Sequence, residues 1–346
     1  MALGKVVLIS SGETSQTGGL VFRKIAASQP KGLRIAILET PAGFELNSAK
    51  VARRVADAMT LRIGDFDPRI AVLPARRRGT PDSPDSPGVA DELQTSDWIY
   101  MGAGSPTYAA RQLRGSLAWE ALLASWQQGA ALILASAAAV AVGKYALPVY
   151  EIFKVGEDPE WKPGLDLFGG LGWRLAVVSH WNNAEGGEEL DTSRCFIGRE
   201  RFDALRKTLP PGAIVLGLDE HTSVVMDWET GKGTVEGKGT VTILRDEKEI
   251  IHPSGGGFAL DELGEYRIPD EPFGVGRETW EKTRVRRAAG GGEPVPPPEA
   301  TALMRDRERI RKEGDYEKAD KVRKEIERLG WKVMDTPQGS VLRPLR

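Results

Sequence analysis

Residues 131–143 read Ala131-Leu-Ile-Leu-Ala-Ser136-Ala-Ala-Ala-Val-Ala-Val-Gly143. The apolar run before the serine is too short for a helix and predicts a buried β-strand. The small residues after it allow a helix to begin at once. Such a strand-to-helix elbow lifts the hydroxyl of Ser136 above the sheet and turns the next backbone N–H groups toward a developing oxyanion. The alternative is a structural serine that caps an Ala-rich helix.

Short apolar runs of the same kind recur through the first half of the chain, with helix-compatible stretches at residues 48–60 and 108–128 between them. Strands that alternate with helices predict a doubly wound α/β domain with a mostly parallel sheet. In that architecture the chemistry gathers at the loops that leave the carboxyl ends of the strands. The other runs lie at residues 6–9, 34–38, 70–73 and 98–101.

The composition changes after about residue 285. Residues 234–244 and 248–252 are typical of a β-hairpin that ends the first domain, which we place at residues 1–285. Residues 286–298 include three consecutive Gly and a Pro-rich stretch, which is typical of a linker.

Residues 299–346 predict a small helical hairpin. Leu303 and Ile310 mark one short helix, and apolar residues at three- and four-residue spacing from Tyr316 to Leu329 mark another. Asp315 is placed to cap the second helix, and a turn is expected at residues 335–339.

Composition narrows the functional classes. The chain has 346 residues, of which 40% are hydrophobic and 28% charged, with a net charge of −2, so no overall field attracts nucleic acid or an acidic membrane. One cysteine and three histidines provide neither a disulfide nor a zinc cluster. The sequence has no phosphate loop or complete dinucleotide fingerprint, so we expect no cofactor and no metal. Without a long apolar run we expect a cytoplasmic protein that does not span a membrane.

A serine nucleophile needs a base and an orienting acid. His180 follows the apolar run at residues 175–178 and so stands at the carboxyl end of a strand, whereas His252 lies in the hairpin region and is expected to be exposed. His221 is the rival base. Glu151 lies between Ser136 and His180, which gives the order Ser, Glu, His that α/β hydrolases also use.

These residues resemble the cyanophycinase and peptidase E family of serine peptidases. The matching elements, in chain order, are Gly102-Ala-Gly104, the elbow around Ser136, Glu151, His180 and Gly217-Leu-Asp219-Glu220-His-Thr222. The resemblance covers about residues 4–250 and implies a class I glutamine amidotransferase-like fold.

The resemblance also implies roles for individual residues. Ser136 matches the nucleophile, His180 the base and Glu151 the acid. The oxyanion hole matches Ala103, Gly104 and the amide of Ala137.

The sequence departs from the family pattern at several positions. Ala138 replaces the glycine of the elbow, and Ala103 replaces one glycine of the preceding loop. Val178-Ser179 precedes His180 where the cyanophycinase branch has Asp-Gln, which argues against cyanophycin as the substrate. The extra Cβ atoms at residues 103 and 138 leave open a catalytically silent relative.

The C-terminal region resembles the anticodon-binding piece of cysteinyl-tRNA synthetase over about residues 299–341. Ala319-Asp-Lys-Val-Arg323 and Asp335-Thr-Pro-Gln-Gly339 have the spacing of that family. From Ala300 onward, 13 Lys and Arg face 9 Asp and Glu, a net charge of +4, which favours contact with phosphates. Arg311, Lys321 and Arg323 are the candidate contacts. The alternative is a helical hairpin whose charges are only solvated.

Together these features predict a serine-type hydrolase, a peptidase that acts on small or acidic peptides, with a tRNA-binding C-terminal segment. The competing hypothesis is a non-catalytic binding protein of the same fold that associates with tRNA. A homo-oligomer is left open.

Overall fold

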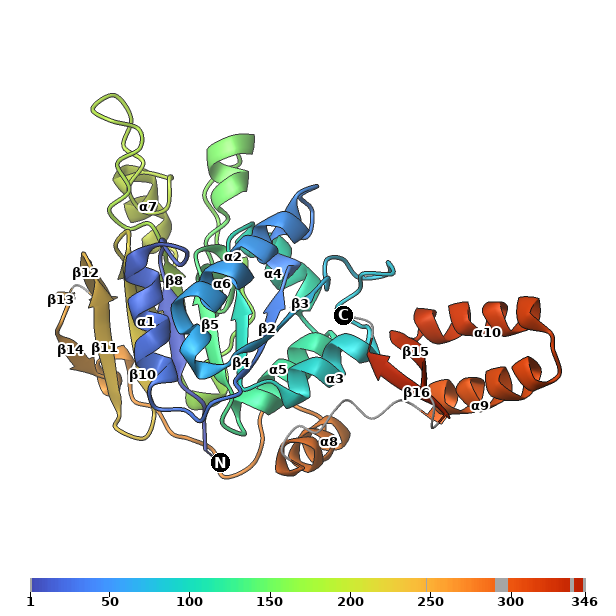
Figure 1. Ribbon diagram of the computed structural model, residues 1–346. Helices are drawn as coiled ribbons and strands as arrows, with labels where there is room; N and C mark the ends of the chain where they lie inside the picture. The colour runs from blue at the N-terminus through green and yellow to red at the C-terminus, as the bar shows by residue number, and fades with distance from the viewer. Residues whose placement is uncertain (1, 247, 290–297, 337–338, 345–346) are drawn as a thin grey trace. The chain divides into compact units, whose positions relative to one another are not determined.

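The computed structural model describes residues 2–246, 248–289, 298–336 and 339–344 (Figure 1). Contacts between residues divide the chain into two compact units, Met1–Arg284 and Val285–Arg346.

The first unit is built around an eight-stranded sheet with the order β14-β11-β10-β1-β5-β4-β2-β3. Strands β1, β5, β4, β2 and β3 pair in parallel with one another, in that spatial order. Strands β10, β11 and β14 pair antiparallel at the other edge. The mostly parallel α/β sheet is therefore confirmed. Its strands are β1 Val6–Ile9, β2 Arg34–Leu38, β3 Arg69–Leu73, β4 Trp98–Met101, β5 Ala131–Ala135, β10 Thr222–Asp227, β11 Lys232–Gly237 and β14 Gly257–Ala259.

Helices cover both faces of this sheet (Figure 1). Successive strand residues point to opposite faces, so Val6 and Leu8 enter one buried cluster while Val7 and Ile9 enter another. The first cluster packs against α3 and α5, and the second against α1 and α2. The helices that lie within this unit are α1 Gln16–Ala26, α2 Ser48–Ile63, α3 Pro87–Thr95, α4 Pro106–Leu113, α5 Leu117–Trp126, α6 Ala137–Ala141 and α7 Arg199–Arg206, and α8 Arg277–Ala288 begins in it and ends past its last residue, Arg284.

The first unit also has a second sheet of four strands, with the order β13-β12-β9-β8. Strands β8 Leu175–Val178 and β9 Ile214–Leu218 are parallel neighbours, while β12 Thr240–Arg245 and β13 Lys248–Pro253 form an antiparallel hairpin. Two short strands, β6 Tyr145–Ala146 and β7 Lys162–Pro163, pair separately.

Two expectations about these elements are corrected. Residues 108–128 form two helices, because the chain leaves α4 after Leu113 and Ser116 caps α5 by accepting from the backbone N–H of Trp119 at 3.1 Å. Residues 234–244 divide between β11 and β12, which belong to different sheets. Only β12 and β13 form the expected hairpin.

Residues 286–288, which were predicted to belong to the linker, are the last turn of α8. Residues 290–297 lie outside the described residues. The predicted domain limits at 285 and 299 otherwise stay predictions.

The second unit contains the two expected helices, α9 Pro298–Lys312 and α10 Tyr316–Arg328. As predicted, Asp315 caps α10, since its side chain accepts from the backbone N–H of Lys318 at 3.0 Å. A β-hairpin follows, in which β15 Trp331–Thr336 pairs with β16 Gly339–Pro344, and the sequence did not predict it. The centre of the turn expected at residues 335–339, residues 337–338, lies outside the described residues.

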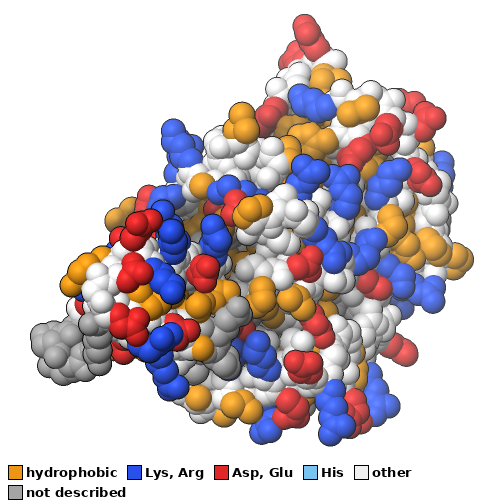
Figure 2. All heavy atoms as spheres, turned by 90° about the vertical axis from the view of Figure 1, so that its right-hand side faces the viewer, with side chains coloured by type: hydrophobic (Ala, Val, Ile, Leu, Met, Phe, Trp, Pro, Cys, Tyr) orange, Lys and Arg blue, Asp and Glu red, His pale blue; other side chains and the backbone are white. Residues whose placement is uncertain are grey.

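The surface carries charges of both signs. On the face seen in Figure 2, Lys and Arg side chains lie among Asp and Glu side chains, in line with the net charge of −2. Within the described residues, no helix combines the length and the apolar character needed to cross a bilayer.

Candidate active site

Ser136 lies at the junction of β5 and α6, as the sequence predicted. Its backbone has φ 50° and ψ −114°, a region that residues with a Cβ rarely adopt. The backbone N–H of Ser136 donates to the carbonyl of Ile9 at 2.8 Å, and its carbonyl accepts from the hydroxyl of Ser179 at 3.2 Å. These bonds from neighbouring strand ends hold the strained elbow in place.

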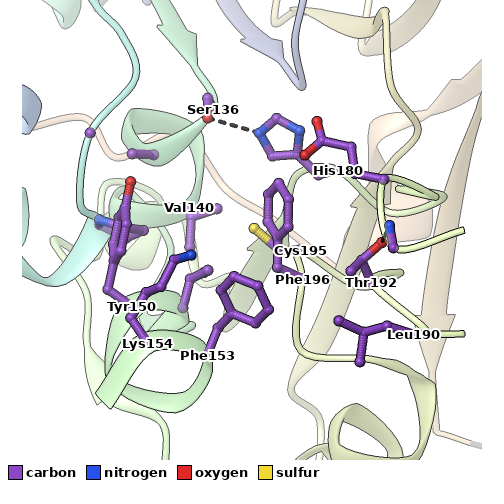
Figure 3. A pocket seen from close by; sticks show the side chains of 16 residues that line it. Ser136, Val140, Tyr150, Phe153, Lys154, His180, Leu190, Thr192, Cys195 and Phe196 are labelled. Atoms are coloured by element: carbon purple, nitrogen blue, oxygen red, sulfur yellow. Dashed lines mark hydrogen bonds between the residues drawn. The ribbon is translucent and has the colours of Figure 1, made fainter. Parts of the chain in front are cut away.

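His180 follows β8 and faces the serine hydroxyl (Figure 3). Oγ of Ser136 lies 2.9 Å from Nε2 of His180. The histidine backbone also has positive φ, at 53°, and its N–H donates to the hydroxyl of Ser10 at 2.7 Å. The predicted nucleophile and base therefore lie within hydrogen-bond distance.

The carboxylate beside His180 belongs to Glu220, which follows β9. Oε1 of Glu220 lies 2.9 Å from Nδ1 of His180 and accepts from the side-chain amide of Asn183 at 2.9 Å. Oε2 accepts from the hydroxyl of Ser11. The hydrogen bond with His180 is the main cause that lowers the pKa of Glu220 to about 2, so this carboxylate is ionised at neutral pH.

Glu151 is not the partner of His180 in the structure, and this expectation is corrected. It begins a π-helical turn, Glu151–Val155, and its Oε1 accepts from the hydroxyl of Thr107 at 2.5 Å. Chain order favoured Glu151. The sequence feature that could have identified Glu220 is its position directly after the apolar run at residues 214–218. His180 also follows a strand, and the carboxyl ends of neighbouring parallel strands lie at the same edge of a sheet.

The other two histidines lie elsewhere. The backbone N–H of His221 donates to the hydroxyl of Ser11 at 3.0 Å, and its side chain is exposed. His252 was expected to be exposed, but its ring is largely buried, 5.0 Å from the ring of Phe258, and its Nε2 lies 2.9 Å from Oε2 of Glu262.

The residues predicted for the oxyanion hole separate into two groups. Gly104 and Ala137 line the same pocket as Ser136, whereas Ala103 lines a small cavity behind the loop. Gly104 has φ +141°, and a Cβ there would lie 2.0 Å from the carbonyl oxygen of Pro41, so this position requires glycine. Ala138 is fully buried in α6 and is not one of the residues that line the pocket.

A pocket of about 410 Å³ opens beside Ser136 and His180. Figure 3 shows Tyr150, Phe153 and Lys154 on one side and Phe196 and Leu190 on the other. The remaining lining residues are Gly104, Pro106, Ala137, Val140, Val149, Glu185, Gly186, Thr192 and Cys195.

Cys195 lines this pocket without being an alternative nucleophile. Burial raises the pKa of its thiol to about 12, and the nearby Glu220 carboxylate adds to the shift. Because the thiolate is the reactive form of cysteine, the protonated thiol is a packing group here.

The arrangement has the elements of nucleophilic catalysis. Glu220 is placed to accept Nδ1–H of His180, which leaves the lone pair of Nε2 for the proton of the Ser136 hydroxyl. No group of three or more His, Cys, Asp or Glu side chains in the described part of the chain is placed to hold a metal ion.

The three cations predicted to contact nucleic acid are all engaged in ion pairs in the second unit. Arg311 pairs with Asp335, Lys321 lies 3.3 Å from Glu317, and Arg323 lies 3.1 Å from Glu327. Their charges are therefore partly compensated within the unit.

Two comparisons describe what the chain is similar to. Residues 293–343 match the family model described as the cysteinyl-tRNA ligase anticodon binding domain. A crystal structure of a peptidase from an acI-B1 Actinobacterium superposes with a TM-score of 0.59 at 20% identity, covering 74% of this chain and 97% of that chain. The two chains share a fold. The expected α/β fold with a large, mostly parallel sheet, followed by C-terminal helices, is confirmed.

A second solved structure is more distant. It is a putative peptidase E protein from Listeria monocytogenes EGD-e, with a TM-score of 0.44 and 14% identity, covering 73% of this chain and 99% of that chain. A comparison with curated protein sequences finds no match.

Proposed function

We propose that the first unit is a serine-type peptidase that cleaves small peptides. The observation that carries this proposal is the continuous hydrogen-bonded series from Oγ of Ser136 through the imidazole of His180 to Glu220, with both distances at 2.9 Å. A nucleophile, a base and an orienting carboxylate in this order are the requirements of acyl transfer. The superposed Actinobacterium structure, a peptidase by its name, supports the same reaction.

In the proposed reaction, Oγ of Ser136 attacks the scissile carbonyl carbon while Nε2 of His180 accepts the hydroxyl proton. Backbone N–H groups at Gly104 and Ala137 stabilise the oxyanion. The imidazolium then donates the proton to the leaving amine as the C–N bond breaks. Water, deprotonated by His180, then attacks the acyl carbon, the bond from this carbon to Oγ of Ser136 breaks, and the imidazolium returns the proton to Oγ as the acid product leaves. Glu220 holds the imidazole in one orientation throughout.

The size of the pocket favours small substrates. Its volume of about 410 Å³ is within the range of about 300–1,000 Å³ that is typical of small-molecule sites. The side chains of Tyr150 and Leu190, which line the pocket, are also partly exposed to solvent.

Reactivity of Ser136 tests this proposal. A fluorophosphonate probe should label the wild-type protein, and labelling should disappear in Ser136→Ala and fall strongly in His180→Ala. Cys195→Ala is the matched control, because it changes the same pocket without removing the nucleophile. Wild-type protein that stays unlabelled and cleaves no peptide would favour the competing hypothesis, a silent binding protein of the same fold.

We propose further that the second unit binds tRNA. The observations that support this function are the family match over residues 293–343 and the net charge of +4 from Ala300 onward. Lys324 and Arg328 are exposed on α10 and enter no ion pair within the described part of the chain. Their uncompensated charges make them stronger candidates for phosphate contacts than Arg311, Lys321 and Arg323.

A titration of the full chain with tRNA at low salt tests the second unit. The double variant Lys324→Gln, Arg328→Gln should weaken binding about tenfold and lower the slope of log K against log salt by about 2. The control is Arg53→Gln, Arg54→Gln on α2, which removes two exposed cations from the first unit. Equal losses in both double variants, or no binding by the wild type, would contradict a tRNA site on α10.

A further inference from the structure

The pocket beside Ser136 is apolar where it is deepest. Val140 is fully buried, and Val149 and Cys195 are nearly so, which places aliphatic and thiol groups at its base. Phe153 and Phe196 add aromatic surface, with ring centroids 5.7 Å apart. The ring of Phe196 also lies 5.7 Å from the ring of His180, so this apolar surface reaches the reacting groups.

Few charged side chains line this pocket in the described part of the chain. The Lys and Glu side chains of the described lining are Lys154 and Glu185, which have opposite signs, and both are exposed. The ammonium of Lys154 lies over the ring of Phe153, 4.5 Å from its centroid. Val140, Val149 and Cys195, buried residues of the lining, carry no charge, so a substrate carboxylate packed against them would lose its hydration without a charged partner from these residues.

The wall that carries Phe196 is built in advance of any substrate. Arg194, Cys195 and Phe196 are three successive residues with positive φ, at 57°, 61° and 71°. Arg194 fixes this turn, since its guanidinium stacks 3.7 Å from the ring centroid of Trp181 and donates to the carbonyl of Trp181 at 2.8 Å. A strained turn held by such contacts presents a rigid apolar surface, which lowers the entropy cost of binding.

We propose that this pocket binds a large apolar or aromatic side chain of the substrate next to the scissile bond and discriminates against an acidic one. The inference rests on the proposed peptidase function and narrows its substrate class. Burial of an aromatic side chain against Val140, Val149 and Phe196 is favourable, whereas burial of a carboxylate at the same place is costly.

Four dipeptides test the proposal on either side of the bond: Phe-Ala, Ala-Phe, Asp-Ala and Ala-Asp. The better Phe dipeptide should exceed the better Asp dipeptide by about 100-fold in kcat/KM. Equal rates, or faster cleavage of an Asp dipeptide, would overturn the proposal while leaving the peptidase in place.

Two variants locate the preference in this pocket. Phe153→Arg places a cation in the wall and should lower the Phe-to-Asp ratio at least about tenfold. The control is Val155→Arg on the same π-helical turn, because Val155 is 71% exposed and does not line the pocket. Leu190→Arg, on the opposite wall and 47% exposed, gives an independent variant if Phe153→Arg does not fold. Equal ratios in the lining and control variants would overturn the assignment.

A binding measurement tests the preference of the pocket independently of peptide cleavage. In Ser136→Ala, calorimetry should show the better Phe dipeptide binding at least about tenfold more tightly than the better Asp dipeptide. This measurement decides the pocket's preference even if the wild type cleaves nothing and is not labelled. Equal or reversed affinities would overturn the proposal.

Discussion

The site around Ser136 and the C-terminal unit use left-handed backbone in opposite ways. Ser136 and His180 both have positive φ although each carries a Cβ. In the described part of the C-terminal unit, the positive-φ positions are Gly314 and Gly330, which follow α9 and α10. Glycine adopts this conformation without strain, whereas serine and histidine do so only when surrounding contacts hold them.

The hydrogen bonds in the two regions also differ in how far apart in the sequence the bonded residues lie. Near the site they join distant parts of the chain, as in the bonds from Ser136 to Ile9 and from Ser11 to Glu220. In the C-terminal unit the cap of α10 spans three residues, from Asp315 to Lys318. The first region therefore depends on the assembled fold, and the second depends largely on local signals.

The largest expected effect distinguishes Glu220 from Glu151. Glu220→Gln should lower kcat about 1,000- to 10,000-fold, because an amide in place of the carboxylate favours the wrong tautomer of His180. Steady-state kinetics on a cleaved dipeptide measures this loss.

Glu151→Gln is the matched control for this comparison. Its carboxylate contacts Thr107, so we expect a change of about threefold at most. A large loss in Glu151→Gln together with a small one in Glu220→Gln would restore the assignment based on chain order.

In the C-terminal unit, the expected weak point is Asp335. It accepts two hydrogen bonds from Arg307, whose side chain is only 6% exposed, and it also pairs with Arg311. Asp335→Asn should destabilise this unit by about 2 kcal/mol, because it leaves a buried guanidinium without its anion. Hydrogen exchange of the full chain should then become faster in α9 and α10 and stay unchanged around Ser136.

The control for Asp335→Asn is Glu317→Gln, which removes an exposed ion pair with Lys321. Such a pair contributes less than about 1 kcal/mol. Equal effects of the two substitutions would mean that this unit has no buried polar anchor.

The pKa of Glu220 predicts a pH dependence for the first unit. Because the pKa is lowered from 4.5 to about 2 in the folded state, the ionised carboxylate stabilises the fold above about pH 4.5. This contribution is lost as the pH falls toward 2. The difference in unfolding free energy between wild type and Glu220→Gln should therefore decrease by about 2 kcal/mol from pH 6 to pH 2. A difference that is constant over this range would contradict the lowered pKa.

The smallest expected effect measures the strain at Ser136. Ser136→Ala and Ser136→Gly both remove the hydroxyl, but only the glycine variant relieves the Cβ at φ 50°. We expect Ser136→Gly to be more stable than Ser136→Ala by about 1 kcal/mol, the reverse of the usual order. Chemical denaturation of both variants measures the difference, and an alanine variant of equal or greater stability would indicate an unstrained elbow.

The sequence predicted elements whose signals are local. Apolar runs identified the strands that carry Ser136 and His180, and the order of small residues identified the elbow. Apolar spacing and the capping residue Asp315 identified α10. The β-hairpin after α10 was missed, because only a turn at residues 335–339 was predicted in this part of the sequence.

The tertiary structure decided which carboxylate meets His180. By sequence alone, Glu151 and Glu220 were both acidic residues near the ends of expected elements, and chain order was the available criterion. The parallel pairing of β8 with β9 brings the ends of these two strands together, and the hydroxyl of Ser11, from the loop after β1, completes the contacts of the Glu220 carboxylate. Local sequence thus determined which residue types stand at strand ends, whereas strand pairing, a long-range property, determined which of those ends face one another.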